Sequence, residues 1–480
     1  MKKTKLNLKL LYLLLTLVLS QACTTDESEI LQEESSLKSL VDETSSKGGA
    51  GLDKVDMIIS WNKLLLELDQ DATGMRPCAT SRSLAYIGLA AYESVVFNFD
   101  NYTSNTNRLE GFSINSSLIS GREINDMVAL NACYAKVIDH FIYNLPSSAK
   151  DDIDDLEEAY EDELRRTMSR RVYDDSRYWG AYVADVIIDY SKTDIEAEEQ
   201  ILEPQPTSYE PPVGEGFWTY RAEEERALFP YWGKVRTFVI SSEETTSVPP
   251  PYAYSRSRRS NYYKEMREVY DVSTRAKRRN NEDLWIAEFW SDDVEGLMVS
   301  PPGRQIAIAL QLIEQYDVDF EESMGMMLKL GFSLNDTAVS SWEDKYTHMV
   351  MRPDLYIHEY IDEDYQTNLY KFIFWPNPTF PGYPSGHAAF ASAAAGIFID
   401  SFGDSTYFVD RTHEGRDVFL GFPRSFNSFS EMAIENAYSR IPLGVHIRMD
   451  CDEGLRLGYE IADAINAFDL TSVNESSVDF

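Results

Sequence analysis

The spacing of apolar residues constrains the fold of this chain most strongly, because it follows the period of an α-helix almost throughout. Apolar side chains recur three and four residues apart in segments spread along the sequence: 61–70, 81–97, 125–145, 156–166, 178–192 and 304–316. The alternation that is typical of β-strands is rare and short. The sequence therefore predicts an all-α protein built as a bundle of packed helices.

Proline clusters and changes in composition divide the chain into segments. Prolines gather at positions where we expect long loops between groups of helices: 204–212, 249–251, 301–302 and 376–384. The residues before the first helical segment are polar and acidic and predict a flexible tether. We therefore expect four segments: a leader at 1–22, the tether at 23–50, an N-terminal helical half at 51–280 and a C-terminal helical half at 281–480.

The first 22 residues have the pattern of an export signal. Four lysines are followed by an apolar run and by small residues directly before Cys23. This arrangement resembles a bacterial lipoprotein cleavage site, although Leu19 lies four residues before the cysteine and the usual leucine lies three before it. The alternative is a plain secretory signal that is cleaved nearby. We expect an exported protein, lipid-anchored at Cys23 in the periplasm or on the cell surface, or else secreted.

The overall charge limits the class of partner. Eighty acidic and 44 basic residues give a formal net charge of −36, which argues against nucleic acid and against an anionic membrane surface as partners. No second apolar stretch long enough to span a membrane follows the leader. Any anion that binds this protein needs a local cluster of basic residues.

The cysteines and the most acidic stretch both have simple interpretations. Cys78, Cys133 and Cys451 form no CxxC pair and no disulfide framework, so either one disulfide or three buried thiols are compatible with the sequence. Residues 151–164 carry many carboxylates at helical spacing and predict a solvated helix face rather than a metal site.

The stretch PGYPSGHAAF, residues 381–390, combines a proline-rich turn, a Ser-Gly-His triplet and a run of small apolar residues. Its order predicts a helix that starts near Ser385, with Gly386 and His387 in the first turn. The first backbone N–H groups of a helix have no partner within the helix, and the helix dipole is positive there, so such an end binds anions. Taken alone, the triplet indicates an ordinary helix cap rather than a binding site.

Two further motifs supply charges and a second histidine. Lys345 and Arg352 are seven residues apart, which predicts that both leave the same face of a helix. Arg440 and His446 are six apart, and Asp450 follows His446 by four, which predicts one helical face on which the carboxylate holds a ring nitrogen. Each motif alone is also compatible with a solvated helix face. Together, three cations, a hydroxyl, a helix N-terminus and two histidines suit a tetrahedral oxyanion.

The three motifs together resemble a known family. The pattern K-x6-R-P, P-S-G-H and S-R-x5-H-x3-D is shared by type 2 phosphatidic acid phosphatases and vanadium-dependent haloperoxidases, and it is complete here from Lys345 to Asp450. The resemblance implies a helical bundle that binds phosphate or vanadate. It implies that the oxyanion is held by Lys345, Arg352, Ser385, Gly386 and Arg440. It also implies that His446 is the axial ligand of vanadium, that Asp450 orients His446, and that His387 is the acid–base residue.

The same geometry serves two chemistries, and several features favour the haloperoxidases. In a phosphatase His446 would attack the phosphoryl group and His387 would protonate the leaving alcohol, whereas in a haloperoxidase His446 holds the metal. The lipid phosphatases of the family have several membrane spans, and its soluble acid phosphatases are about half as long as this chain. Residues 61–95 resemble the N-terminal region of bacterial haloperoxidases, and the resemblance runs from about residue 58 to residue 468.

Two aromatic residues extend the resemblance to a halide pocket. Trp342 and Phe380 occupy positions that are apolar in fungal chloroperoxidases and bacterial iodoperoxidases, whereas algal bromoperoxidases have Arg and His there. An apolar wall suits a soft halide better than a sugar phosphate. The alternative is that both side chains are merely part of the core.

Other residues near the motifs have weaker signals. Asp292 and Asp293 are candidates for a carboxylate that pairs with one of the three oxyanion-binding cations. We expect His413 on a surface loop, with the entrance of the site as the alternative. His348 and His358 lie near the first motif without an assigned role.

The sequence therefore predicts a vanadium-dependent haloperoxidase that oxidises iodide or bromide with hydrogen peroxide. The cofactor is vanadate, and the partners are small molecules, with membrane contact only through a lipid anchor. A secreted acid phosphatase and a non-catalytic surface lipoprotein on the same scaffold are the alternatives. Halide preference, an organic substrate and the oligomeric state do not follow from the sequence.

Overall fold

Helices make up nearly all of the regular structure in the computed structural model, which describes residues 52–222, 225–279, 281–292, 294–371, 377–416 and 421–471. The all-α prediction is confirmed. Within these residues the only sheet pairs strands β1 (Phe408–Asp410) and β2 (Arg424–Phe426) in antiparallel register, with Phe408 opposite Phe426. The predicted leader, the tether and Cys23 lie outside the described residues.

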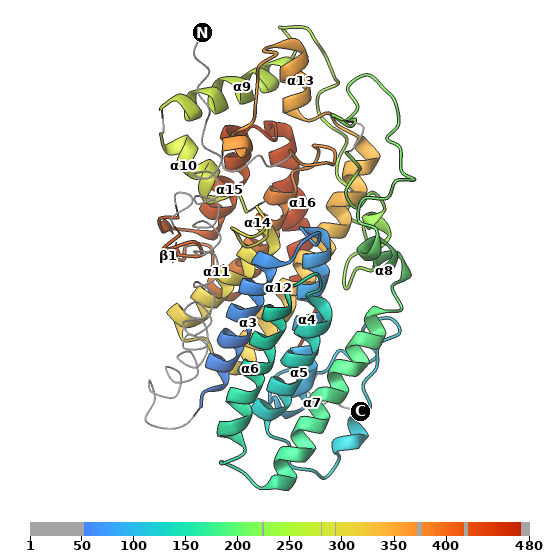
Figure 1. The fold of residues 1–480 in the computed structure, drawn as a ribbon, viewed down its shortest axis with the longest axis vertical. Helices are drawn as coiled ribbons and strands as arrows, with labels where there is room; N and C mark the ends of the chain where they lie inside the picture. The colour runs from blue at the N-terminus through green and yellow to red at the C-terminus, as the bar shows by residue number, and fades with distance from the viewer. Residues whose placement is uncertain are drawn as a thin grey trace, which may run out of the picture.

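The helices follow one another along an elongated molecule, with the N-terminal ones at one end and most of the C-terminal ones at the other (Figure 1). The N-terminal group is α3 (Lys54–Asp71), α4 (Cys78–Val95), α5 (Asp126–Phe141), α6 (Ser147–Leu164), α7 (Arg170–Ser191) and α8 (Ile195–Leu202). The second group is α9 (Asn261–Arg279), α10 (Glu282–Phe289), α11 (Pro301–Tyr316), α12 (Phe320–His348), α13 (Pro353–Tyr360), α14 (Gly386–Phe402), α15 (Phe429–Leu443) and α16 (Arg448–Ala467). Short 3₁₀ turns cover Val96–Asn98, Ser116–Ile119, Trp232–Lys234 and Asn368–Lys371.

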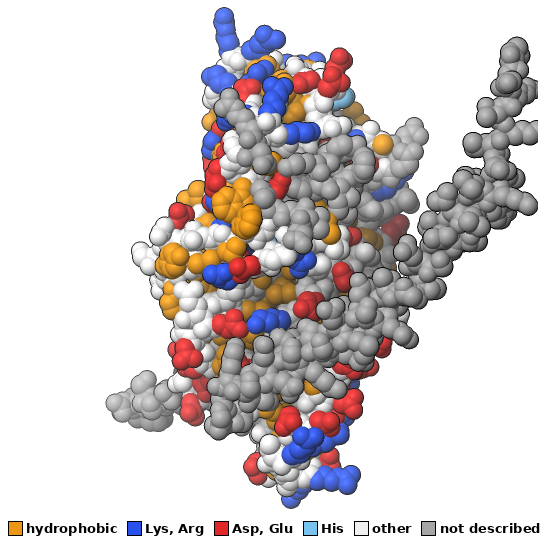
Figure 2. All heavy atoms as spheres, turned by 60° about the vertical axis from the view of Figure 1, so that its left-hand side comes forward, with side chains coloured by type: hydrophobic (Ala, Val, Ile, Leu, Met, Phe, Trp, Pro, Cys, Tyr) orange, Lys and Arg blue, Asp and Glu red, His pale blue; other side chains and the backbone are white. Residues whose placement is uncertain are grey.

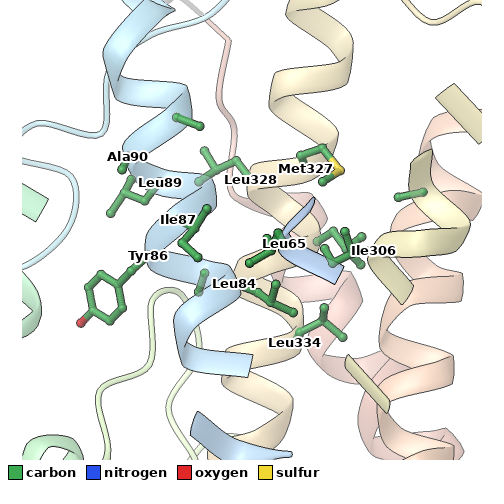
Figure 3. Close-up of a cluster of buried hydrophobic side chains, with 14 of the residues drawn as sticks. Leu65, Leu84, Tyr86, Ile87, Leu89, Ala90, Ile306, Met327, Leu328 and Leu334 are labelled. Atoms are coloured by element: carbon green, nitrogen blue, oxygen red, sulfur yellow. The ribbon is translucent and has the colours of Figure 1, made fainter. Parts of the chain in front are cut away.

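Helix α12 joins the two groups, because it packs against α4 of the first group and against α14 and α16 of the second. Figure 3 shows the contact: Leu84 and Ile87 of α4 lie beside Leu328 and Leu334 of α12, with Leu65 of α3 close by. These side chains belong to one continuous buried cluster that runs from α3 to α16. The core is therefore shared across the boundary that the sequence suggested near residue 280.

Helices α14 and α16 run parallel and unusually close together, and this pair positions the site. Glycines allow the approach: a Cβ atom at Gly454 or Gly458 would overlap the carbonyl oxygens of Ser385 and Ala389 in α14. The backbone N–H of Ser385 donates to the Asp450 carbonyl at 2.8 Å, which joins the first turns of the two helices. The positive ends of two helix dipoles therefore meet at one point.

The acidic helix, the cysteines and the absence of a membrane span can also be compared with the sequence predictions within the described residues. Helix α6 buries a stripe that includes Ile153, Leu156 and Tyr160, and its carboxylates lie on the other faces. Cys78, Cys133 and Cys451 are buried free thiols rather than a disulfide pair. None of the described helices has the length and hydrophobicity that crossing a membrane requires.

Candidate active site

A cavity of about 270 Å³ opens beside the N-terminus of α14. It collects side chains from each of the three motifs, because it is lined by Arg352, by Gly386 and His387, and by Arg440 and His446. Segments of the N-terminal half and of the loops complete the wall: Gly74, Arg76, Pro77, Gln205, Leu228, Asn377 and Thr379. The motifs that are distant in the sequence therefore converge on one cavity.

Ser385 is the N-cap of α14, as the sequence predicts. Its backbone is extended, and its hydroxyl accepts a hydrogen bond from the Ala388 N–H at 3.5 Å. Gly386 is the first residue of the helix and lies in the cavity wall, where a Cβ atom would come within 3.3 Å of the Trp342 ring. The absence of a side chain leaves the first N–H groups of α14 close to whatever the cavity holds.

Lys345 and Arg352 reach the site differently from the prediction, because they do not share one helix. Helix α12 ends at His348, Met349 adopts a left-handed conformation with φ of 51°, and Arg352 is the N-cap of α13. Pro353 explains the break, since the residue before a proline is disfavoured in a helix. The Lys345 Nζ donates to carbonyl oxygens of the loop that leads into α14, those of Pro381, Gly382 and Pro384.

Arg440, His446 and Asp450 were also expected on one helical face, and this prediction is wrong. Arg440 lies in the last turn of α15, Gly444 ends that helix with φ of 95°, and His446 stands before α16. Asp450 is in the first turn of α16, where its carboxylate accepts from the Ile447 N–H at 3.2 Å. The carboxylate that contacts His446 therefore also caps the helix that follows it.

The partners of His446 determine which ring nitrogen is protonated. Arg352 Nη1 lies 3.0 Å from Nε2, and a guanidinium can only donate, so Nε2 is the acceptor. The proton is then on Nδ1, which lies 3.1 Å from Asp450 Oδ2. Arg352 Nη1 also donates to the Val445 carbonyl at 3.0 Å, which holds the guanidinium beside the ring. The basic nitrogen Nε2 is thereby aimed at the cationic side of the site.

The partner of His387 fixes the opposite tautomer. Its Nε2 lies 3.1 Å from the Ser291 carbonyl oxygen, which can only accept, so Nε2 carries the proton. The neighbouring carbonyl, that of Trp290, accepts from Arg440 Nη2 at 2.5 Å. In the neutral ring of His387 the basic atom is therefore Nδ1.

The charges of the site favour a bound anion. Burial and the adjacent Arg352 lower the pKa of Lys345 well below its ordinary value, and burial and neighbouring cations do the same to His387 and His446. Burial raises the pKa of Asp450 to about 7, so the neighbouring carboxylate is readily neutralised. Crowded donors of this kind, at two helix N-termini, fit a multiply charged oxyanion.

This arrangement predicts that anion binding is coupled to proton uptake. Burial and, after it, repulsion by neighbouring cations lower the pKa values of Lys345, His387 and His446. A bound oxyanion attracts the protonated forms, so these pKa values rise and protons bind. Sulfate is the suitable probe because it remains fully deprotonated at neutral pH. Titration calorimetry in buffers of different ionisation enthalpy should show uptake of about one proton per sulfate. His387→Gln should reduce the uptake, exposed His358→Gln should not, and zero uptake by the wild type would contradict the charge assignment.

Trp342 and Phe380 both line the cavity, and their ring centroids are 4.9 Å apart. The Lys345 Nζ lies 5.5 Å from the Trp342 ring centroid and 5.4 Å from that of Phe380. The Arg352 guanidinium lies 4.8 Å from the Phe380 centroid. These rings therefore form an apolar wall directly beside two of the cations, although Trp342 is itself deeply buried.

His413 is not on a surface loop, so that prediction is wrong. Its side chain is buried, and Nδ1 lies 2.8 Å from Arg304 Nη1. The same arginine also contacts the Asp292 carboxylate at 3.2 Å, so Asp292 pairs with a cation outside the predicted set. Asp293 lies outside the described residues. The sequence contained no signal for Arg304, because no motif includes it.

The two histidines near the first motif, His348 and His358, lie away from the cavity. His348 ends α12 and packs edge-on against Tyr383, with ring centroids 5.4 Å apart. His358 is exposed on α13. Neither side chain lines the cavity that holds the three motifs.

Comparison with known proteins tests the resemblance that the three motifs suggest. The family model described as the VCPO second helical-bundle domain matches residues 325–475, which include all three motifs. The structure is similar to the crystal structure of the first bacterial vanadium-dependent iodoperoxidase, with a TM-score of 0.76 and 26% identity over 88% of this chain and 98% of that one. The resemblance to the vanadium haloperoxidase family is therefore confirmed. A search of curated protein sequences found no match.

Two structures with lower sequence identity share the fold of this chain. The holo-type bacterial vanadium-dependent chloroperoxidase has a TM-score of 0.62 and 16% identity, over 82% of this chain and 92% of that one. The apo-type structure has a TM-score of 0.61 and the same identity, over 82% and 94%. The similarity extends well beyond the matched domain and includes the N-terminal helices.

Proposed function

We propose that the protein is a vanadium-dependent haloperoxidase that oxidises iodide or bromide with hydrogen peroxide to the hypohalous acid. The observation that carries the proposal is the convergence of Arg352, Arg440 and two histidines, His387 and His446, on one cavity at the N-terminus of α14. The likeness to a bacterial iodoperoxidase supports iodide as a substrate.

The donor set fits vanadate. Lys345, Arg352 and Arg440 would contact its oxygens, together with the Ser385 hydroxyl and the Gly386 N–H, and His446 Nε2 would bind the metal. The tautomer of His446 suits this role, because Asp450 holds the proton on Nδ1 and Nε2 carries a lone pair, which accepts from Arg352 in this structure. When bound, vanadate supplies a Lewis-acidic centre that makes hydrogen peroxide reactive toward halide without a required change in oxidation state.

His387 is the residue that would move protons. Its Nε2–H is held by the Ser291 carbonyl, so Nδ1 can accept a proton from hydrogen peroxide as it enters the cavity. The pKa of His387 lies well below its ordinary value because of burial and the positive charge of Arg440, so the ring is neutral and ready to act as a base. A bound oxyanion would raise this pKa toward the range in which the proton can also be returned.

The wall formed by Trp342 and Phe380 supports a soft halide as the second substrate. Both rings border the cavity next to Lys345 and Arg352, so an anion there would contact apolar surface on one side and cations on the other. Iodide and bromide are weakly hydrated, so they lose little hydration free energy when they enter a partly apolar cavity.

A paired assay tests the proposal. The mature protein is stripped of phosphate and divided, one part being loaded with orthovanadate. The loaded part is assayed for peroxide-dependent oxidation of iodide and of bromide, and the unloaded part for hydrolysis of a chromogenic phosphate ester. Vanadate-dependent triiodide formation is the expected result. Ester hydrolysis that vanadate inhibits, without halide oxidation, would identify a phosphatase instead, and neither activity would leave a non-catalytic protein.

The acidic surface predicts a salt effect on the halide reaction. The net charge is −36, and Figure 2 shows acidic and basic side chains interspersed over one face. A net negative field lowers the local concentration of halide, and added salt screens it. We expect kcat/KM for iodide to rise with ionic strength at low salt, with a flat or falling response as the contrary result. Hydrogen peroxide is uncharged, so kcat/KM for peroxide at saturating iodide serves as the control.

We also propose that the protein is exported and anchored through a lipid on Cys23. Supporting this are the lysine-rich start, the apolar run and the cysteine that follows it. Mass spectrometry of the membrane fraction should find a lipidated N-terminal Cys23, and Cys23→Ser should release the protein. An unmodified mature N-terminus elsewhere would indicate ordinary secretion.

A further inference from the structure

A short segment between α10 and α11 holds two of the groups that face the oxyanion cavity. The carbonyl of Ser291 accepts from His387 Nε2 at 3.1 Å, and the carbonyl of Trp290 accepts from Arg440 Nη2 at 2.5 Å. The position of these two carbonyl oxygens therefore sets the tautomer of His387 and the direction of the Arg440 guanidinium. Whatever fixes residues 289–292 also fixes these two side chains.

Arg304 of α11, which is completely buried, contacts this segment at several points. Arg304 Nη1 donates to the Phe289 carbonyl at 3.1 Å and contacts the Asp292 carboxylate at 3.2 Å. It therefore contacts the first and the last residue of the segment 289–292. Its guanidinium carbon also lies 4.3 Å from the Phe289 ring centroid and 4.8 Å from that of Trp290. Asp292, at the end of the segment, has a left-handed conformation with φ of 45°, which is rare for a residue with a side chain.

Arg304 is in turn oriented by residues from the segment between α14 and α15. Its Nε donates to Asp410 Oδ2 of β1 at 2.9 Å, and its Nη1 donates to His413 Nδ1 at 2.8 Å. Asp410, His413 and Asp292 are all buried. The other oxygen of Asp410 accepts from the N–H and the hydroxyl of Thr412, which anchors the carboxylate. The cluster is thus a buried network in which one guanidinium connects the β1 region to the segment beside the cavity.

A buried ion pair is a poor source of stability, because the loss of hydration offsets much of the attraction. Such a network does impose geometry, since an arginine fork accepts only a narrow set of partner positions. Mutation of groups that hold ligand-binding residues in place, without contacting the ligand, commonly changes affinity by about 10- to 100-fold. We propose that Arg304, oriented by Asp410 and His413, is a positioning residue of the oxyanion site, acting on His387 and Arg440 through the carbonyls of Ser291 and Trp290.

This inference deepens the proposed function, because it concerns the same site, but its test requires neither vanadate nor halide. Arg304→Lys keeps the positive charge and loses the fork that contacts both ends of the segment. Arg82→Lys is the matched control, because Arg82 is also a buried arginine, bonded to Glu198 at 2.8 Å and to the Ser191 carbonyl at 2.9 Å in the N-terminal half. Both substitutions are expected to lower the melting temperature.

The first measurement is sulfate affinity by titration calorimetry, and the second is the tautomer of His387 by long-range ¹H–¹⁵N NMR. The chain has six histidines, so a sample labelled only at histidine gives a spectrum that single substitutions can assign. Arg304→Lys should weaken sulfate about 10-fold or more and shift the His387 nitrogens away from the pure Nε2–H pattern. Arg82→Lys should leave both properties at their wild-type values. Unchanged sulfate affinity and unchanged His387 signals in Arg304→Lys, or equal changes in Arg82→Lys, would overturn the proposal.

Asp410→Asn provides the same test if Arg304→Lys does not fold. It preserves the shape of the side chain and weakens the contact with Arg304, and its own hydrogen bonds join it to Arg304 and Thr412 rather than to residues 289–292. Its effect on sulfate should have the same direction as that of Arg304→Lys, and the double variant should be no weaker than Arg304→Lys alone. Wild-type sulfate binding by a folded Asp410→Asn would overturn the proposed route. If halide oxidation is absent while these shifts occur, only the proposed activity fails.

Discussion

His446→Ala is expected to weaken vanadate binding by more than about 100-fold, because it removes the nitrogen that would bind the metal. This loss should exceed the effect of removing a residue that only orients a metal ligand. Sulfate, which forms no bond to a ring nitrogen, should be affected much less. Lys345, Arg352, Arg440 and the N-terminus of α14 all remain in the variant. The difference between the two anions therefore separates metal binding from electrostatic attraction.

Equilibrium dialysis with vanadium analysis measures the first affinity, and calorimetry measures the second. Asp450→Asn is the graded comparison: it removes the charge behind His446 while Nε2 remains, so vanadate should weaken by about 10- to 100-fold. His358→Ala, at an exposed position on α13, should change neither affinity. If His446→Ala weakened both anions to the same extent, His446 would be a general anion contact rather than the vanadium ligand.

His387→Ala is expected to keep vanadate but to lower the turnover of halide by at least about 100-fold, within the usual contribution of an acid–base residue. The reason is the tautomer, since the Ser291 carbonyl holds Nε2–H and Nδ1 is then the basic nitrogen of the ring. Steady-state kinetics with iodide and dialysis with vanadate measure the two effects on the same preparation.

Chemical rescue tests whether the lost function is proton transfer. The cavity of about 270 Å³ borders His387, so the alanine variant leaves additional space there. Added imidazole should restore part of the turnover in His387→Ala and none in His446→Ala. Loss of vanadate together with turnover, or full turnover without the ring, would show that His387 does not have the assigned role.

Several elements of the site follow from local sequence alone. The helical period predicted the all-α fold, because amphipathic repetition depends only on residues three and four apart. The Ser-Gly-His triplet after a proline-rich turn predicted the cap of α14 at Ser385, because a short polar side chain before an apolar run is a local start signal. The set of charged residues in the three motifs predicted an oxyanion site, and the family assignment agrees with that chemistry.

Two local inferences were wrong because helix spacing was extended across a break. The left-handed Met349 lies between Lys345 and Arg352, and a new helix starts at Pro353, directly after Arg352. Gly444 separates Arg440 from His446. Pro353 and Gly444 are themselves break signals in the sequence, so these errors were avoidable. The residues still meet, because the chain turns at each break and returns to the same cavity.

The hydrogen-bond partners of His387, Arg440 and Arg304 could not be inferred from the spacing of residues in the sequence. His387 contacts a carbonyl 96 residues earlier in the chain, Arg440 contacts one 150 residues earlier, and Arg304 contacts His413 across 109 residues. Two of these contacts use backbone oxygens, which every residue possesses, so no residue type marks them. His413 looked like a loop residue because its burial depends on α11, a helix far away in the sequence. Local chemistry thus specified the helices and the reactive groups, whereas long-range packing determined their tautomers, pKa shifts and orientation.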